Sequence, residues 1–349
     1  RSSAASDVYK RQVVRPGPLG QLAQTHQLFD LADVGGVGKA AGAAGIAQRD
    51  GDVVLFADVQ DLVKVLIEGV LVAGHAHPCK DKTSTTAYEY RLTDGEISVA
   101  TGEFTTAAEI ALQNGSLDGW DGSSPNAATD SKFWDTSNEG AKMGGLTPTQ
   151  AVTDFVHTQG GKAAKLESGK VDLMGGIFAA ASLYTGSFGS TNIWTQTATV
   201  NFGQSFTARP IALKGFYKYT PNVINLVKNV PAGVTIVKDQ TLDQCAIYIA
   251  LAKKTYTIDN GNQSTFIDFK NDENIIAYGE LPSGAATEGD GYVEFNIPLK
   301  YKNLTDQPTH IIVVCSSSKY GDYMTGGAGS TLYVDDLSLI YDGTPTIWE

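Results

Sequence analysis

Short apolar runs, each ended by glycine, proline, asparagine or aspartate, fill most of this chain beyond residue 160. They alternate with the period of two that is typical of β-strands and show almost no helical periodicity. Regular short strands separated by turn signals are typical of β-sandwiches. We therefore predict an all-β fold, a jelly-roll sandwich. The runs cover residues 163–166, 198–202, 211–219, 246–252, 292–299, 311–316 and 331–341.

The last of these runs changes its phase at Asp335-Asp336. Leu332 and Val334 alternate on one face, whereas the apolar positions beyond the aspartates begin at Leu337. A slip of one residue in a period-two pattern predicts a β-bulge. Because neighbours on a strand point to opposite faces, the two aspartates are a poor acid/base pair for a glycosidase. We expect Asp336 to face a neighbouring strand, a loop or a calcium ion.

The first third of the chain differs in composition from the rest. Residues 1–12 resemble the translation of a transposase adapter and are set aside as a processing scar. Residues 13–80 contain no Ser, Asn, Tyr or Trp, which favours an out-of-frame or chimeric segment over a separate domain. Residues 81–113 are interpreted as a linker or the remnant of a preceding β module. The main domain is expected at 114–343, followed by a tail at 344–349.

Charge and hydropathy argue against two classes of partner. The net charge of −12 among 349 residues opposes binding to nucleic acid, which needs clustered Lys and Arg. The best apolar stretch, 62–73, is interrupted by Lys64 and Glu68, so no insertion into a membrane is predicted. Residues 58–72 instead predict a helix, with Asp58 as its N-cap.

Neither the cysteines nor any sequence motif indicates a catalytic site. Cys245 and Cys315 lie in apolar runs, which favours buried free thiols over a disulfide between them. The chain has no Gly-x-Ser-x-Gly nucleophile elbow, no His-Glu-x-x-His zinc pair and no strand-spaced pair of carboxylates. These absences favour a protein without catalytic activity.

Aromatic residues are the candidates for ligand contact. Tyr217 and Tyr219 share one face of the run at 211–219, and such rings could either stack on sugars or pack the core. Trp134 lies beside Asp and Asn residues, including Asn138, in a segment without periodicity. This arrangement suits a loop that binds a glycan, with a tryptophan plugging the end of the sandwich as the alternative.

Aspartates are the candidates for a metal site. Calcium takes several hard oxygen ligands in flexible geometry, and Asp336 could meet Asp118 if the first and last strands are neighbours. The alternative is that these aspartates cap turns or backbone N–H groups of nearby segments.

Several segments between residues 114 and 343 form an ordered set. They are Leu117-Asp118-Gly119-Trp120, 134–138, 161–168, 184–189, 206–219, 316–323 and 329–336. Taken together, this set resembles the putative carbohydrate metabolism domain (PCMD) family of Bacteroidota.

The resemblance implies a jelly roll similar to carbohydrate-binding modules, with a glycan or polysaccharide as its partner. It also implies a secreted, surface-exposed or periplasmic protein that is a lipoprotein in its intact form. It supplies no catalytic residues, but Tyr320 in the segment 316–323 becomes a further candidate for sugar contact. In similar modules an acidic residue on the first strand and an Asp near the last hold a structural calcium, and Asp118 and Asp336 occupy those places.

Three functions remain open from the sequence. The first is non-catalytic binding of carbohydrate through an aromatic platform. The second is hydrolysis of a polysaccharide by a glycoside hydrolase. The third is a structural role as a cell-surface or adhesin subunit, for which the partners would be envelope proteins.

Overall fold

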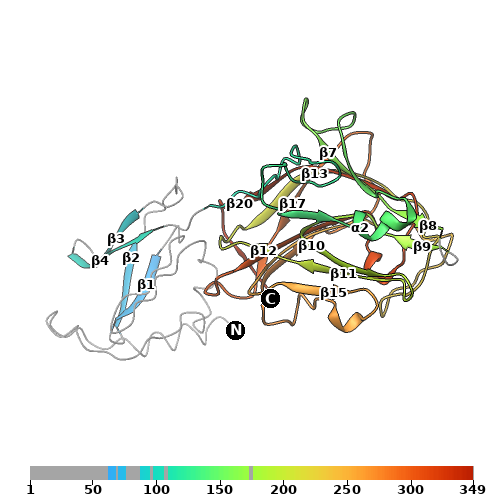
Figure 1. Ribbon diagram of the computed structural model, residues 1–349. Helices are drawn as coiled ribbons and strands as arrows, with labels where there is room; N and C mark the ends of the chain where they lie inside the picture. Colours follow the sequence, from blue (N-terminus) through green and yellow to red (C-terminus); the bar gives the residue numbers. More distant parts are fainter. Residues whose placement is uncertain are drawn as a thin grey trace. The chain divides into compact units, whose positions relative to one another are not determined.

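The computed structural model describes residues 109–172 and 176–348 and, before them, the backbone of four strands. The chain divides into two units, residues 1–109 with 342–345 and residues 110–341 with 346–349. Figure 1 shows both units.

The first unit contains two antiparallel hairpins. Strand β1 (Leu62–Ile67) pairs with β2 (Val70–His75), and β3 (Ala87–Asp94) pairs with β4 (Ile97–Thr105). The helix predicted over 58–72 is therefore wrong where the structure describes it, because the β-branched residues of this stretch favour strands. The interpretations of residues 1–12 and of most of 13–80 lie outside the described residues.

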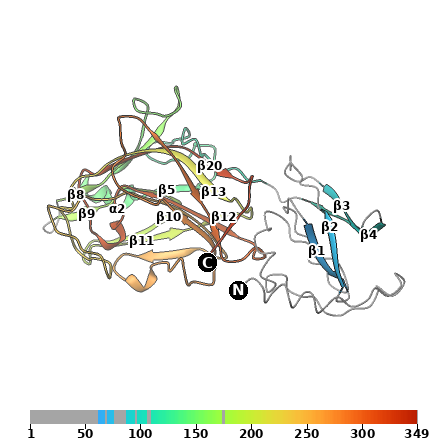
Figure 2. The same ribbon diagram turned by 180° about the vertical axis from the view of Figure 1, so that it is seen from behind.

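The second unit is a sandwich of two sheets, visible as two layers in Figures 1 and 2. This confirms the predicted all-β sandwich. In order across the smaller sheet, the strands are β17 (Val293–Pro298), β13 (Ala212–Thr220), β20 (Thr331–Ile340), β7 (Ala163–Glu167) and β6 (Thr149–Val152).

The larger sheet has ten strands. Its main path is β15 (Tyr256–Asp259), β11 (Thr197–Phe202), β10 (Ser182–Asn192), β19 (His310–Ser316), β14 (Ala246–Ala252), β16 (Ile275–Glu280), β18 (Lys300–Tyr301) and β21 (Thr346–Ile347). Two short strands extend it, with β12 (Gln204–Ser205) beside β19 and β5 (Trp134–Thr136) beside β10.

Short elements connect the sheets. They are helix α2 (Asn138–Ala141), the 3-10 turns η3 (Lys142–Gly144), η4 (Gln263–Thr265) and η5 (Gly321–Tyr323), and a hairpin of β8 (Gly169–Val171) with β9 (Ile177–Ala179). No described helix has the length and apolar character needed to cross a membrane.

The ten-stranded sheet is apolar on both of its faces. On β14, Ile247, Ile249 and Leu251 belong to the core between the sheets, whereas Ala250 belongs to a second apolar cluster on the outer face. Strands that are apolar on both faces must be covered on both faces. The outer face therefore needs loops, short helices or a ligand to shield it from water.

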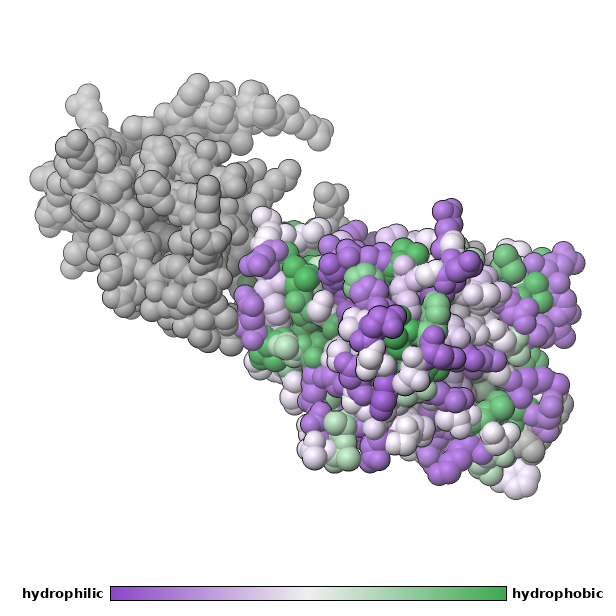
Figure 3. All heavy atoms as spheres, turned by 90° about the horizontal axis from the view of Figure 1, so that it is seen from above, coloured by the Kyte–Doolittle hydropathy of each residue, from purple (hydrophilic) through white to green (hydrophobic). Residues whose placement is uncertain are grey.

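The outer face of the five-stranded sheet is polar by comparison. It carries the ion pairs Lys165–Glu167 at 2.5 Å and Lys214–Glu294 at 3.1 Å. Viewed from the side of this sheet, hydrophilic atoms predominate and hydrophobic ones form separate patches (Figure 3). The two outer faces of the sandwich thus differ in chemistry.

The predicted bulge in the last strand is confirmed. The register between β13 and β20 shifts after Lys214, which pairs with Ser338, while Phe216 pairs with Asp335. Asp336 lies at the shift and has a φ of 49°, a left-handed conformation that aspartate tolerates better than most residues. The bulge turns the Asp336 side chain toward the loop at 157–158.

Both described cysteines are buried free thiols, as the apolar runs around them predicted. Cys245 and Cys315 lie on the inner side of the larger sheet. Burial raises the pKa of the Cys245 thiol to about 12, and it raises the pKa of Cys315 as well. Neither thiol is therefore activated for nucleophilic chemistry at neutral pH.

A buried carboxylate ties the closing glycine turn to the sandwich. Asp243 is 1% exposed, and its Oδ2 accepts hydrogen bonds from the Ser318 hydroxyl at 2.6 Å, the Gly327 N–H at 2.7 Å and the Ser330 hydroxyl at 3.1 Å. Its Oδ1 accepts one from the Gln244 N–H at 2.8 Å. Desolvation raises the pKa of this carboxyl, and these four donors oppose that rise.

We expect Asp243→Ala to lower the free energy of unfolding by about 2 kcal/mol or more, because the buried Gly327 N–H and the buried Ser318 and Ser330 hydroxyls would lose their acceptor. Chemical denaturation monitored by circular dichroism measures the change. Asp290→Ala, at an exposed carboxylate, is the control and should stay within about 0.5 kcal/mol of the unmodified protein. An unchanged stability for Asp243→Ala would show that the network does not hold the turn.

Candidate functional site

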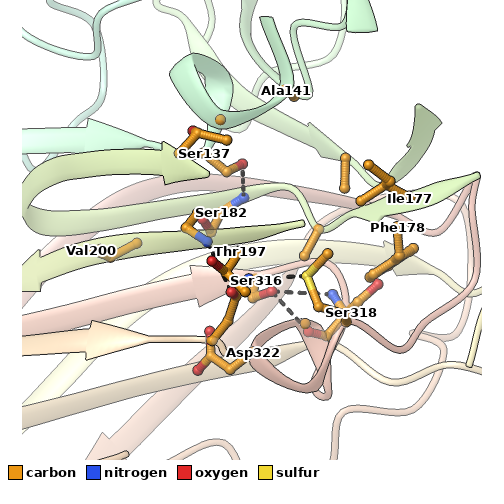
Figure 4. Close-up of a pocket in the computed structure, with 18 of the residues that line it drawn as sticks. Ser137, Ala141, Ile177, Phe178, Ser182, Thr197, Val200, Ser316, Ser318 and Asp322 are labelled. Carbon is orange, nitrogen blue, oxygen red and sulfur yellow. Dashed lines mark hydrogen bonds between the residues drawn. The ribbon is translucent and has the colours of Figure 1, made fainter. Parts of the chain in front are cut away.

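A cavity of about 190 Å³ opens on the outer face of the ten-stranded sheet. Strands β10, β11, β14 and β19 contribute residues to it. Helix α2 with η3, the β8–β9 hairpin, the β10–β11 turn and the segment around η5 contribute the rest (Figure 4). The cavity thus occupies part of the apolar face that requires cover.

The most deeply buried lining residues are apolar or aromatic. The Tyr184 hydroxyl is already engaged, since it donates to the Thr136 carbonyl at 3.1 Å. These walls therefore offer contact area and few hydrogen bonds. The buried lining residues of this kind are Val171, Phe178, Tyr184, Phe202 and Val314.

Apart from Ser318, which is 1% exposed and donates its hydroxyl to Asp243 Oδ2, the polar lining residues are exposed or half-buried and mark the mouth of the cavity. They include Asn192, Gln196, Asn260, Lys319 and Asp322. The Asn260 amide donates to Met324 Sδ at 3.0 Å. The cavity thus combines an apolar interior with a polar mouth, an arrangement typical of ligand sites.

Asp322 and Tyr248 are two of the lining groups with hydrogen-bonding capacity to spare. Neither the Asp322 carboxyl nor the Tyr248 hydroxyl makes a hydrogen bond to another described residue. The atoms packed around the cavity raise the pKa of the Asp322 carboxyl by desolvation. Desolvation, aided by the charge of Asp322, raises the pKa of Tyr248 far above its usual value. Both groups are thus available to a ligand.

Helix α2 and η3 cover one side of the cavity, and two glycines determine how closely they pack against the other lining residues. A Cβ atom on Gly140 would press against the Phe188 ring, and one on Gly144 would overlap the Val171 side chain. Both glycines line the cavity. Because these glycines have no side chains, α2 and η3 can pack close to strand β10 and to the β8–β9 hairpin.

Trp194 stands at the tip of the β10–β11 turn with 86% of its surface exposed. Its neighbours Ile193 and Gln196 line the cavity. The Asn192 side chain shapes the turn by accepting hydrogen bonds from the N–H groups of Trp194 at 3.0 Å and Thr195 at 3.3 Å. The ring is therefore held beside the cavity with both of its faces largely open.

Sequence analysis missed Trp194, although a signal was present. The run Asn192-Ile193-Trp194-Thr195-Gln196 places a large aromatic residue in a turn between two strands. A tryptophan in such a tip cannot enter the core, so its exposure could have been inferred.

Trp134 and Tyr219 are core residues and cannot form a binding platform. Both are 0% exposed. The Trp134 ring N–H donates to the Gln113 carbonyl at 2.7 Å, and the Tyr219 hydroxyl donates to the Ser317 carbonyl at 2.9 Å. Their rings therefore have no free face to offer a sugar, and the alternative of core packing holds for both.

The other three aromatic and amide candidates also lie away from the cavity lining. Tyr217 packs against the core, edge to face with Phe295. The Asn138 side chain accepts from the Thr149 N–H at 2.8 Å and donates to the Thr149 carbonyl at 2.7 Å, so its amide is fully used. Tyr320 is half-buried just before η5 and does not line the cavity.

Asp118 and Asp336 are engaged by different parts of one loop. Asp118 Oδ1 accepts from the Lys162 N–H at 2.7 Å. Asp336 Oδ2 accepts from the Thr158 hydroxyl at 2.6 Å and lies 2.7 Å from His157 Nδ1. Within the described residues no cluster of three acidic, His or Cys side chains is placed to hold a metal ion. The two aspartates therefore do not fit one shared calcium site, and calcium at either stays a prediction.

If neither aspartate binds calcium, the melting temperature is unchanged by excess EDTA, and the hydrogen bonds that Asp118 and Asp336 already accept favour this outcome. Differential scanning fluorimetry with EDTA, and then with added calcium, measures this. A ligand that binds only the folded state must raise apparent stability. A melting temperature that falls with EDTA and recovers with calcium would therefore establish a metal site.

We expect Asp322→Asn to raise stability at pH 7, by less than about 1 kcal/mol because solvent reaches this side chain. A pKa raised in the folded state means that stability falls as pH rises from the ordinary value of 3.8 through the raised value. The advantage of the variant should therefore vanish near pH 4. Thermal unfolding across this range, with Asp290→Asn as the control, measures it, and a less stable variant at pH 7 would contradict the expectation.

Comparison with known proteins places the second unit in a family. The model of the family described as "Putative carbohydrate metabolism domain" matches residues 109–340. No curated protein matches the chain.

Comparison with solved structures finds two that are described as putative glycoside hydrolases. The one from Bacteroides thetaiotaomicron is 21% identical with a TM-score of 0.50, over 84% of this chain and 88% of that one. The one from Bacteroides vulgatus is 24% identical with a TM-score of 0.45, over 61% and 88% of the two chains. A structure of TmCBM61 in complex with β-1,4-galactotriose is 10% identical with a TM-score of 0.25, over 60% and 88%. Since the family model spans more than half of the sequence, the chain belongs to the putative carbohydrate metabolism domain (PCMD) family.

Proposed function

We propose that this protein binds a glycan at the cavity on the outer face of the ten-stranded sheet, without chemical turnover. Trp194 is the aromatic platform in this proposal, in place of the five residues expected from the sequence. The observation that carries it is a tryptophan with 86% of its surface exposed, held directly beside a cavity with a polar mouth. Membership of a carbohydrate-related family supports the choice of ligand.

The expected contribution of Trp194 is enough to be measured. An indole ring that covers a sugar face hides roughly 80 Å² of apolar area, which at about 25 cal/mol/Å² is worth on the order of 2 kcal/mol. Hydroxyls at the edge of the sugar would meet Asn192, Gln196 and Asp322, which are exposed or half-buried at the mouth. A carboxylate that accepts from a sugar hydroxyl makes one of the stronger kinds of hydrogen bond.

Hydrolysis of a glycan is the second candidate, and the raised pKa of Asp322 is the observation in its favour. A carboxyl with a raised pKa suits a general acid. Most glycosidases, however, need two carboxyl groups about 5 to 9.5 Å apart, and Asp322 is the one carboxylic residue among the described residues that line this cavity. Binding without hydrolysis therefore explains the site better, because it does not require a second carboxyl group.

The same proposal places the protein outside the cytoplasm, as a secreted, surface-exposed or periplasmic protein that carries a lipid anchor in its intact form. The resemblance to exported Bacteroidota proteins supports this location. A polysaccharide too large to enter a cell would be met there.

We expect Trp194→Ala to weaken glycan binding by about 30-fold, the equivalent of about 2 kcal/mol. A glycan array identifies the ligand, and isothermal titration calorimetry then measures the dissociation constants. Leu242→Ala is the matched control, because Leu242 is 57% exposed but lies outside the cavity lining.

Two results would overturn the proposal. A flat array at high protein concentration would exclude glycan binding. Release of reducing sugar that disappears in Asp322→Asn would replace binding by hydrolysis.

A further inference from the structure

We infer that the cavity receives an uncharged apolar group, an acyl or aryl substituent carried by the bound sugar, while the sugar ring itself stays at the mouth beside Trp194. This inference rests on the proposed function and names the class of glycan, one decorated with an apolar group.

The distribution of polar and apolar side chains in the lining supports this assignment. Val171, Phe178 and Phe202 line the cavity and are each about 95% buried or more, whereas Asn192 and Lys319 line it and are exposed. A bare sugar ring pushed inside would leave hydroxyl groups against apolar walls, and each unpaired hydroxyl costs on the order of 1 to 3 kcal/mol. An acyl chain or a phenyl ring has no such groups to satisfy.

The size of the cavity fits a group of this kind. Its volume is about 190 Å³, and an apolar cavity of about 150 Å³ is large enough to bind benzene. A phenyl ring or a short acyl chain therefore fits inside. The rest of a larger glycan must lie outside the cavity, on the side where Trp194 projects.

The apolar interior favours an ester, ether or aryl group over a free acid. A carboxylate placed among Val171, Phe178 and Phe202 would lose its hydration without gaining a charged partner there. The Tyr248 hydroxyl also lines the cavity without a described partner, so it can donate to a carbonyl or ether oxygen of the ligand. One acceptor oxygen on a neutral substituent satisfies the Tyr248 hydroxyl, while a sugar hydroxyl at the mouth can donate to the Asp322 carboxylate.

The experiment compares the methyl, hexyl and phenyl glycosides of β-D-glucose, β-D-galactose and β-D-xylose, with 1-hexanol as a probe that lacks the sugar. Ligand-observed NMR and calorimetry measure the affinities below the micelle concentration of each compound. Each buried methylene is worth about a fourfold gain in affinity. For at least one sugar we expect a gain of about tenfold or more from methyl to hexyl, a comparable gain for phenyl, and weaker binding of 1-hexanol than of the hexyl glycoside.

Two variants that fill the cavity test where the substituent lies. Val200→Phe and Ala198→Phe enlarge lining residues of β11, and thermal unfolding checks that each variant folds. We expect them to abolish the gain from hexyl or phenyl while an array-positive glycan without a substituent keeps its affinity. Leu242→Ala, at an exposed residue outside the cavity lining, is the control that should retain the gain.

The outcomes separate this inference from the proposed function. Equal affinities for methyl, hexyl and phenyl glycosides, with glycans bound on the array, would overturn the apolar substituent and leave glycan binding intact. A gain that survives both filling variants would also overturn it. Binding of 1-hexanol as tight as that of the hexyl glycoside, with a flat array, would overturn both, because the sugar would not be recognised.

Discussion

The buried carboxylate of Asp243 is the contact on which both the core and the cavity depend. Its oxygens accept from Ser318, Gly327 and Ser330, which lie at both ends of the connection between β19 and β20. That connection contains η5 and therefore Asp322. One buried group thus fixes the path of a segment that reaches from the inner core to the mouth of the cavity. Several hydrogen-bond donors converge on this carboxylate and offset the free-energy cost of removing it from water.

The two outer faces of the sandwich explain why the site lies where it does. The outer face of the five-stranded sheet carries ion pairs, and its aromatic residues Phe216 and Tyr333 are covered by contacts with other rings. The ten-stranded sheet instead places Val200, Phe202 and Val314 on its outer face, and loops shield them incompletely. The remaining opening is the cavity. The candidate site is therefore a consequence of a sheet that is apolar on both faces, and the connecting segments decide what it can hold.

The sequence predicted features that depend on neighbouring residues well, and it predicted poorly those that depend on contacts between segments far apart in the chain. Alternation of apolar residues located β14 at 246–252 and the slip at Asp335-Asp336 located the bulge, because both are properties of neighbouring residues. Tyr217 and Tyr219 were placed on the same face, as observed, but alternation cannot tell which face is buried. Trp134 was misjudged because β5 pairs with β10, some 50 residues later. The cavity has no local signal, since its lining residues come from segments between 137 and 324.

The glycines of α2 and η3 allow the depth of the cavity to change in small steps through substitution. A Cβ on Gly140 would press against the Phe188 ring, and one on Gly144 would overlap Val171 of β8. Alanine at either position would therefore move α2 and η3 away from β10 and the β8–β9 hairpin by a fraction of the width of a methyl group. Related proteins could exchange one apolar substituent for a longer or thicker one by changing these two residues, while the strands of the two sheets and the Asp243 network stay as they are.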